Sequence, residues 1–202
     1  MAEAGLRRLV AREAANLLYR GVVHEYYQAK LLAAKSLGVR TLPSNLEVAR
    51  ELAKIGEEFG GELLKRRLIS LRREALSVMK LLSEFHPKLI GSVWRGVITP
   101  QSDIDIEVYA ENPKNVAKRL ERFGKLRVER QTVRGDGAPA EVYHIYFRLP
   151  SGSEVEVVVR PPEHRYERRR CEIFGDIITG LTLNELERLL REEPDRKFAP
   201  LV

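Results

Sequence analysis

The feature that most limits how this chain can fold is a short segment in which acidic and apolar residues alternate. From Asp103 to Tyr109 the sequence reads D-I-D-I-E-V-Y. A strand with this pattern presents its carboxylates on one face and its isoleucine and valine side chains on the other. Like charges roughly 7 Å apart along one face repel each other. The repulsion destabilises the strand unless a cation lies among the carboxylates, and Mg²⁺ is a hard ion that prefers carboxylate oxygens.

A second feature precedes the acidic strand. An apolar strand is predicted from Lys88 to Ser92, so that Gly91-Ser92 forms its end, and ten residues then separate Ser92 from Asp103. A glycine and a serine at such a corner offer backbone N–H groups and a hydroxyl without a bulky side chain, which suits a phosphate group. Together, the corner and the acidic strand predict a site that holds a metal–triphosphate complex.

These residues resemble a known signature. Gly91-Ser92, the ten-residue gap and Asp103-Ile104-Asp105-Ile106 resemble the motif of the DNA polymerase β-like nucleotidyltransferase superfamily. The longer text G-S-V-W-R-G…S-D-I-D-I is most similar to the catalytic head of archaeal CCA-adding enzymes and to small archaeal nucleotidyltransferase-domain proteins. The resemblance covers residues 76 to 161. It implies an α+β fold with a mixed-sheet nucleotidyltransferase core flanked by helices.

The resemblance also implies the metal ligands. Asp103 and Asp105 match two of the superfamily's metal-binding carboxylates, and Glu156 in the strand E-V-E-V-V-V-R matches the third. The close relatives have Asp where this chain has Glu156, and Glu154 is a possible substitute. Two Mg²⁺ or Mn²⁺ ions are implied as cofactors. His24, His86, His144 and His164 show no metal-ligand spacing, so none is assigned to a metal.

The same resemblance indicates which residues bind the nucleotide. Gly91 and Ser92 are expected to bind the β- and γ-phosphates of a nucleoside triphosphate, such as ATP. Arg95 either neutralises triphosphate charge or is an ordinary surface arginine. Ser102 either contacts phosphate or caps the entry to the acidic strand. Glu107 continues the acidic pattern but is not a family ligand, and it is read as a neighbour of the ligands or as surface.

The rest of the chain divides at residue 61. An all-helical N-terminal region is predicted over 1–61, and a nucleotidyltransferase catalytic domain with a short C-terminal helical extension over 62–202. Helices are expected from 4 to 38 with a break at Gly21, from the Ser44–Glu47 capping box to 59, over 62–84, over 112–123 and from Thr182. Strands are expected over 126–134 and 140–149, joined by a hairpin loop at 135–137. The tail from Pro194 is expected to be loose.

The composition limits the partners and the cellular compartment that we expect. The chain has 202 residues and a net charge of +6. This balance favours an anionic partner such as RNA or tRNA, although a charge-rich solvated surface would look the same. The helix over 62–84 is expected to expose a basic face that includes Arg72. The single cysteine, Cys171, excludes an intrachain disulfide and a cysteine-based zinc site and fits a reducing cytoplasm. No signal peptide and no membrane span is expected.

Three functions therefore stay open. The leading hypothesis is a metal-dependent nucleotidyltransferase that moves a nucleoside monophosphate from a triphosphate to an acceptor hydroxyl, on RNA, with release of pyrophosphate. The second is a nucleotide- or RNA-binding module without catalysis, which the departure at Glu156 motivates. The third is a transferase for a small molecule or a protein, since the segment after Pro161 is shorter than CCA-adding enzymes use to measure tRNA. The sequence predicts neither the base, the acceptor nor the oligomeric state.

Overall fold

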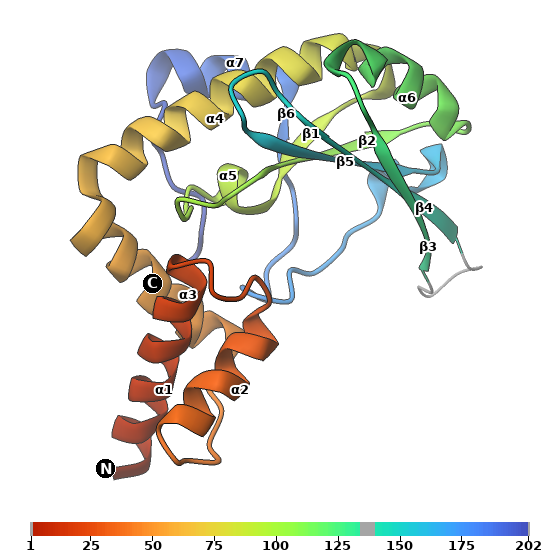
Figure 1. The fold of residues 1–202 in the computed structure, drawn as a ribbon. Coiled ribbons are helices and arrows are strands. Elements are labelled where there is room, and N and C mark those ends of the chain that lie inside the picture. Colours follow the sequence, from red (N-terminus) through yellow and green to blue (C-terminus); the bar gives the residue numbers. More distant parts are fainter. Residues whose placement is uncertain (1, 134–139, 202) are drawn as a thin grey trace.

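The computed structural model describes residues 2–133 and 140–201, and this part of the chain contains one mixed sheet beside several helices (Figure 1). The strand order is β3-β4-β5-β2-β1-β6. β2 and β5 run parallel, and the other neighbouring strands are antiparallel. The strands are β1 (Lys88–Ile90), β2 (Ile104–Tyr109), β3 (Arg127–Val133), β4 (Ala140–Arg148), β5 (Glu154–Arg160) and β6 (Leu181–Thr182). The α+β fold class is confirmed.

The two faces of this sheet differ, as the alternation along β2 predicts. Ile104, Ile106 and Val108 are fully buried on the face covered by α4 (Gly61–Leu81), α6 (Pro113–Leu120) and α7 (Leu183–Glu192) (Figure 1). The opposite face carries the polar side chains of β2 to β5. Burial of the apolar face, at roughly 25 cal/mol per Å², is the main force that holds the sheet against its helices.

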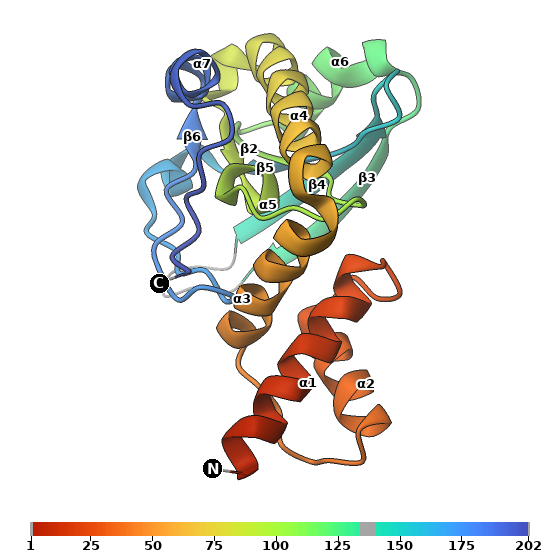
Figure 2. The same cartoon turned by 90° about the vertical axis from the view of Figure 1, so that its left-hand side faces the viewer.

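The N-terminal region is helical, as predicted, and has a hydrophobic core of its own. It contains α1 (Ala2–Tyr19), α2 (Tyr26–Ser36) and α3 (Asn45–Ile55), and the π-helical segment Gly56–Gly60 leads into α4. Figure 2 shows these helices below the sheet, joined to it by the long α4. The break predicted at Gly21 is longer than expected, because α1 ends at Tyr19 and α2 begins at Tyr26. The division at residue 61 stays a prediction.

Local signals set most helix ends. The Ser44–Glu47 capping box at the start of α3 and the Thr182–Glu185 box at the start of α7 are both present. Asn112 caps α6, whose first residue is a proline. Short 3₁₀ turns follow or link the larger elements at Ser83–Phe85, Glu121–Phe123 and Pro162–Tyr166. The predicted hairpin loop at 135–137 lies outside the described residues.

Two predictions about charge and mobility are wrong, and one side chain explains both. Arg72 is completely buried and does not lie on the basic face of α4. Its guanidinium donates hydrogen bonds to backbone carbonyls before β2 and in the C-terminal tail; the acceptors are Val93, Trp94, Pro194 and Arg196, at 2.8 to 3.1 Å. The tail is therefore bound to the domain. Helical periodicity accounts for the error, because residue 72 falls in the stripe of Leu68 and Ala75 that faces the core.

Burial lowers the pKa of Arg72 to about 10, so the group remains charged at neutral pH. A planar guanidinium with five donors suits this role, because one side chain satisfies carbonyls from two separate segments.

We predict that Arg72→Met destabilises the protein by about 3 kcal/mol or more, because it leaves several buried carbonyls without donors at about 1–3 kcal/mol each. Arg72→Lys should recover little, since an ammonium has only three donors on a single nitrogen. The measurement is the shift of the urea unfolding midpoint. Arg73→Met, at the exposed neighbouring position on α4, is the control and should change stability by less than about 0.5 kcal/mol. A shift as small as that of the control would contradict the role given to Arg72.

Candidate active site

Three neighbouring strands bring the predicted site residues together. Ile90 of β1 pairs with Asp105 of β2, and Asp105 pairs in turn with Glu156 of β5. Gly91 follows directly after β1 and starts the short helix α5 (Gly91–Arg95). The parallel pairing of β2 with β5 thus puts two carboxylates, fifty residues apart in the chain, side by side.

Gly91 is in direct contact with Asp105. Its φ is +69°, and a Cβ at this position would lie 1.9 Å from Oδ2 of Asp105 and 2.7 Å from its Cγ. Any larger residue would therefore displace the aspartate, in addition to the strain of a positive φ. Ser92 is partly buried next to it. The corner and the acidic strand occur together in space, as their spacing in the sequence predicted.

The carboxylates stand in a site that disfavours negative charge. Burial, together with the charges of Asp103 and Glu156, raises the pKa of Asp105 well above its ordinary value. Burial also raises the pKa of Asp103, with further contributions from Glu156 and Glu154, and His24 from the loop after α1 acts in the opposite direction. Desolvation and like charge are two of the causes that shift carboxyl groups in this direction.

Glu156 has polar partners on β4. The Nδ1 atom of His144 lies 2.6 Å from Oε1 of Glu156, and the Nε2 atom of the same ring lies 3.1 Å from Oε1 of Gln131. Burial raises the pKa of Tyr146 to about 12, and its interaction with Glu156 acts in the same direction. Glu156 is thus held by neighbours, whereas the sequence argument treated it alone.

The chemistry of these carboxylates fits a divalent cation. Within residues 2–133 and 140–201, no lysine or arginine is within ion-pair distance of Asp103, Asp105 or Glu156. Carboxylates are hard oxygen donors, and Asp103 and Asp105, with raised pKa values and no lysine or arginine partner, match what Mg²⁺ or Mn²⁺ requires. As the side chains stand, no group of three His, Cys, Asp or Glu residues in the described part of the chain is arranged to hold a metal ion.

Arg95 has surroundings that the sequence did not predict. Its side chain is buried, and it forms two hydrogen bonds of 2.6 Å with the carboxylate of Asp176. Its guanidinium carbon lies 4.0 Å from the ring centre of Trp94 and 4.9 Å from that of Phe174. Arg95 is therefore not a surface arginine, and it ties α5 to the loop between β5 and β6. A triphosphate contact by Arg95 stays a prediction that this geometry does not favour.

Ser102 and Glu107 also have defined partners. The Ser102 hydroxyl accepts a hydrogen bond of 2.9 Å from the backbone N–H of Thr99, in the turn that leads into β2. Glu107 is buried and does not lie at the surface; it is paired with Arg169 and accepts a hydrogen bond from Tyr109. Of the two readings of Ser102, the cap of the strand entry describes its contacts.

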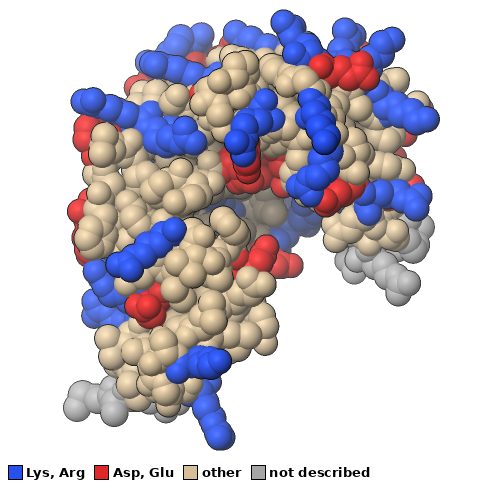
Figure 3. All heavy atoms as spheres, viewed as in Figure 1, with Lys and Arg blue, Asp and Glu red and all other residues tan. Residues whose placement is uncertain are grey.

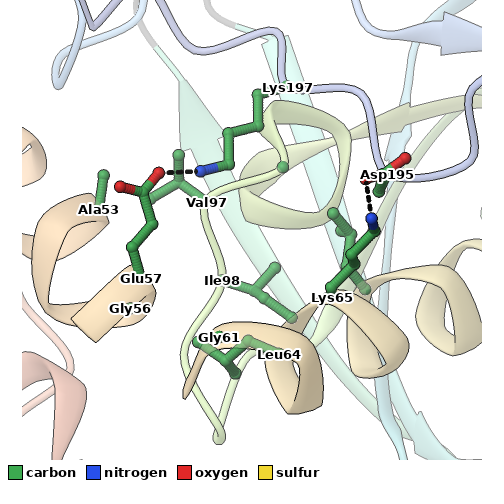
Figure 4. Close-up of a pocket in the computed structure, with 12 residues that line it drawn as sticks. Ala53, Gly56, Glu57, Gly61, Leu64, Lys65, Val97, Ile98, Asp195 and Lys197 are labelled. Carbon is green, nitrogen blue, oxygen red and sulfur yellow. Dashed lines mark hydrogen bonds and ion pairs between the residues drawn. The ribbon is translucent and has the colours of Figure 1, made fainter. Parts of the chain in front are cut away.

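Two cavities bear on the carboxylate site, one at a distance from it and one beside it. One, of about 330 Å³, lies away from the carboxylates, between the Gly56–Gly60 segment, α4, residues 96–98 and the tail. Figure 4 shows its two bridging ion pairs, Lys197–Glu57 at 2.6 Å and Lys65–Asp195 at 2.9 Å. The other, of about 270 Å³, lies beside Asp103 and is lined by Lys125, Arg127, Tyr146, Phe147, Arg148, Glu154 and Val155. Figure 3 shows that the molecule is hollowed between the helical region and the sheet.

Comparison with known proteins gives one match to a family. Residues 88–174 match the nucleotidyltransferase domain family. The chain contains a nucleotidyltransferase domain. The matched segment runs from the start of β1 past the end of β5 and includes Gly91, Asp103, Asp105 and Glu156. Nucleotidyltransferases of this family generally use divalent metals and nucleoside triphosphates.

Other comparisons add little to the nucleotidyltransferase assignment. A solved structure of the polymerase core of TRAMP, an RNA surveillance complex, shares 24% identity with a TM-score of 0.31. The match covers 58% of this chain and 37% of that chain. Comparison with curated proteins gives no significant match. Among the described residues, no helix is both long enough and apolar enough to cross a membrane.

Sequence reasoning missed the residues that surround the carboxylates. His144 was set aside because no metal-ligand spacing involves it, and Tyr146 was not singled out. Alternation along β4 places both side chains on the polar face of the sheet, and this alternation can be read from the sequence. Their contact with Glu156 depends on the β4–β5 register, which pairs Tyr146 with Glu156, and the sequence carries no signal for that register.

We predict that Asp105→Asn stabilises the metal-free protein at pH 8. Because the pKa of Asp105 is raised on folding, its favourable contribution is present below its unfolded value near 3.8 and is lost as the pH rises through the raised value. The variant should melt several degrees higher at pH 8, and the difference should shrink as the pH falls or as Mg²⁺ is added to the wild type. Glu84→Gln, at an exposed position, is the control. A lower melting temperature for Asp105→Asn at pH 8 would refute the electrostatic account.

Proposed function

We propose that this nucleotidyltransferase moves a nucleoside monophosphate from a nucleoside triphosphate to an acceptor hydroxyl and releases pyrophosphate. The observation that carries the proposal is the placement of Asp105 and Glu156 on adjacent strands beside Gly91, where no lysine or arginine of the described residues pairs with either carboxylate. Carboxylates that repel each other in the free protein are suited to bind the divalent cations that accompany a nucleoside triphosphate.

Each residue has a distinct task in this proposal. Gly91 lets the backbone approach the β- and γ-phosphates closely, and Ser92 adds a hydroxyl donor. Asp103, Asp105 and Glu156 would hold two Mg²⁺ or Mn²⁺ ions. Such ions supply charge that stabilises the attacking and leaving oxygens of an in-line displacement. The acceptor oxygen forms the new bond to the α-phosphorus, the bond from the α-phosphorus to the bridging oxygen breaks, and the hydroxyl proton passes to water.

The charge of the cavity beside Asp103 supports RNA as the acceptor. Its basic lining residues, Lys125, Arg127 and Arg148, lie on the opposite side of β2 from Gly91. Arg127 and Arg148 are paired with Glu129 and Glu154, and Lys125 has no ion pair within the described ranges. Phosphate groups suit such a lining, while a polycationic small acceptor would be repelled. The chain's net charge of +6 also favours an anionic acceptor.

A catalytically silent nucleotide-binding module is the second candidate. The glutamate at position 156, hydrogen-bonded to His144, favours it, because a longer and engaged side chain is a less direct metal ligand than the aspartate of the relatives. A transferase for small molecules or proteins is the third candidate, and the acceptor alone distinguishes it from the leading one. We place the protein in a reducing compartment such as the cytoplasm, on its single cysteine.

We predict that the wild type releases pyrophosphate and labels an acceptor in a screen of the four nucleoside triphosphates with RNA pools and Mg²⁺ or Mn²⁺. Asp105→Asn should lower the rate at least 100-fold while remaining folded, because it removes a metal ligand and keeps the shape of the side chain. Glu84→Gln should be as active as the wild type. Triphosphate binding without pyrophosphate from any acceptor would favour the silent module, and transfer by Asp105→Asn at the wild-type rate would refute the site.

We predict that Lys125→Ala weakens binding of a single-stranded RNA oligonucleotide and lowers the slope of log K against log salt by about 0.7, the contribution of one phosphate contact. Lys118→Ala is the matched control, because Lys118 is an exposed lysine on α6, at the helix-covered face of the sheet. Fluorescence anisotropy at several salt concentrations measures both quantities. Equal slopes for the two variants would argue against RNA at this cavity.

A further inference from the structure

We propose that His144 is a positioning residue that holds Glu156 in place as the third carboxylate, and that this contact compensates for the longer side chain at that position. The inference rests on the proposed function, because it concerns how one of the proposed metal ligands is oriented. It goes beyond that function by assigning a role to a residue of β4 that contributes no ligand itself.

The first support is the geometry of the imidazole ring, which is held at both nitrogen atoms. Nδ1 lies 2.6 Å from Oε1 of Glu156, and Nε2 lies 3.1 Å from Oε1 of Gln131. Gln131 belongs to β3, His144 to β4 and Glu156 to β5, so the chain of contacts crosses three adjacent strands. The side chains of His144 and Glu156 are each only 20% exposed. Nδ1 is placed to donate to the carboxylate, and the contact of Nε2 with the Gln131 amide restricts rotation of the ring at its other end.

The second support is the packing around the ring. The rings of His144 and Tyr146 are close to parallel, at 14°, with their centres 6.3 Å apart. The guanidinium carbon of Arg127 lies 4.0 Å from the centre of the Tyr146 ring. Tyr146 also interacts with Glu156, its partner in the β4–β5 register. Two side chains of β4 therefore restrict Glu156 from the side opposite Asp105.

The third support is the difference between glutamate and aspartate. Glutamate has one more rotatable bond, so its carboxylate samples more positions and loses more side-chain entropy when it is held. A hydrogen bond from His144 to one oxygen removes much of that freedom before any cation binds, and a carboxylate has a second oxygen to offer to a cation. Mutation of a residue that orients a metal-binding side chain commonly lowers metal affinity or activity 10- to 100-fold.

The test compares metal binding with stability in five variants, one of them a double variant. His144→Ala should weaken Mn²⁺ binding about 10-fold or more, measured by electron paramagnetic resonance of free Mn²⁺, and should lower kcat with little change in KM for the triphosphate. His144→Asn should recover much of both, because the Asn amide can donate from near the position of Nδ1. Glu156→Asp should weaken its contact with His144, so that adding His144→Ala to it should have little further effect. His164→Ala is the control, since His164 also contacts a glutamate, Glu167, at 3.0 Å.

The outcomes separate this inference from the proposed function. If His144→Ala lowers the melting temperature but leaves Mn²⁺ affinity and kcat unchanged, His144 is only structural and the inference is overturned. Additive effects of His144→Ala and Glu156→Asp would also overturn it, as would a wild type that takes up no Mn²⁺. If His144→Ala weakens Mn²⁺ binding in a protein that releases no pyrophosphate with any acceptor, the inference holds and the proposed transfer fails. Should His144→Ala not fold, His144→Asn and Glu156→Asp provide the same comparison.

Discussion

The parallel pairing of β2 with β5 is the constraint on which the rest of the molecule depends. It places Asp105 beside Glu156, next to a corner where only a glycine leaves room for the aspartate. Such a cluster opposes folding, because burial and like charge both raise the pKa values of Asp103 and Asp105. The apolar face of the same strands offsets this effect, since Ile104, Ile106 and Val108 are fully buried under the helices.

The positive charge of this protein is used in two different ways. Arg72 and Arg95 are buried and bind backbone carbonyls, an aspartate and aromatic rings, and through these contacts they attach the segment after the Gly91 corner to the tail and to the β5–β6 loop. Lys125, Arg127 and Arg148 are exposed beside Asp103. A count of basic residues combines both groups, so net charge alone overstates the charge that is free to meet an anionic partner.

Glu107 and Asp105, two carboxylates of β2, have neighbours of opposite charge. Glu107 is buried but paired with Arg169, with Arg160 at 3.9 Å, and these arginines belong to β5 and to the loop that follows it. Asp105, two residues earlier on the same face, has acids for neighbours. A carboxylate with a basic partner contributes to the fold, whereas one that lacks such a partner is available to a cation. The same alternating pattern thus contains both a structural residue and a proposed ligand.

The family resemblance implied the α+β class, and the sequence by itself determined the approximate positions of β1 to β5, the capped helix ends and the proximity of the Gly91 corner to Asp105. The features that the sequence determined by itself follow from side-chain periodicity and short-range spacing, which act within a few residues of one another. Only the tertiary structure decided that Arg95 is internal, that Arg72 binds the tail, that Glu107 has a basic partner and that His144 contacts Glu156. Each of these depends on which residues meet across strand registers and long loops, and local alternation specifies the face of a strand but not its partner.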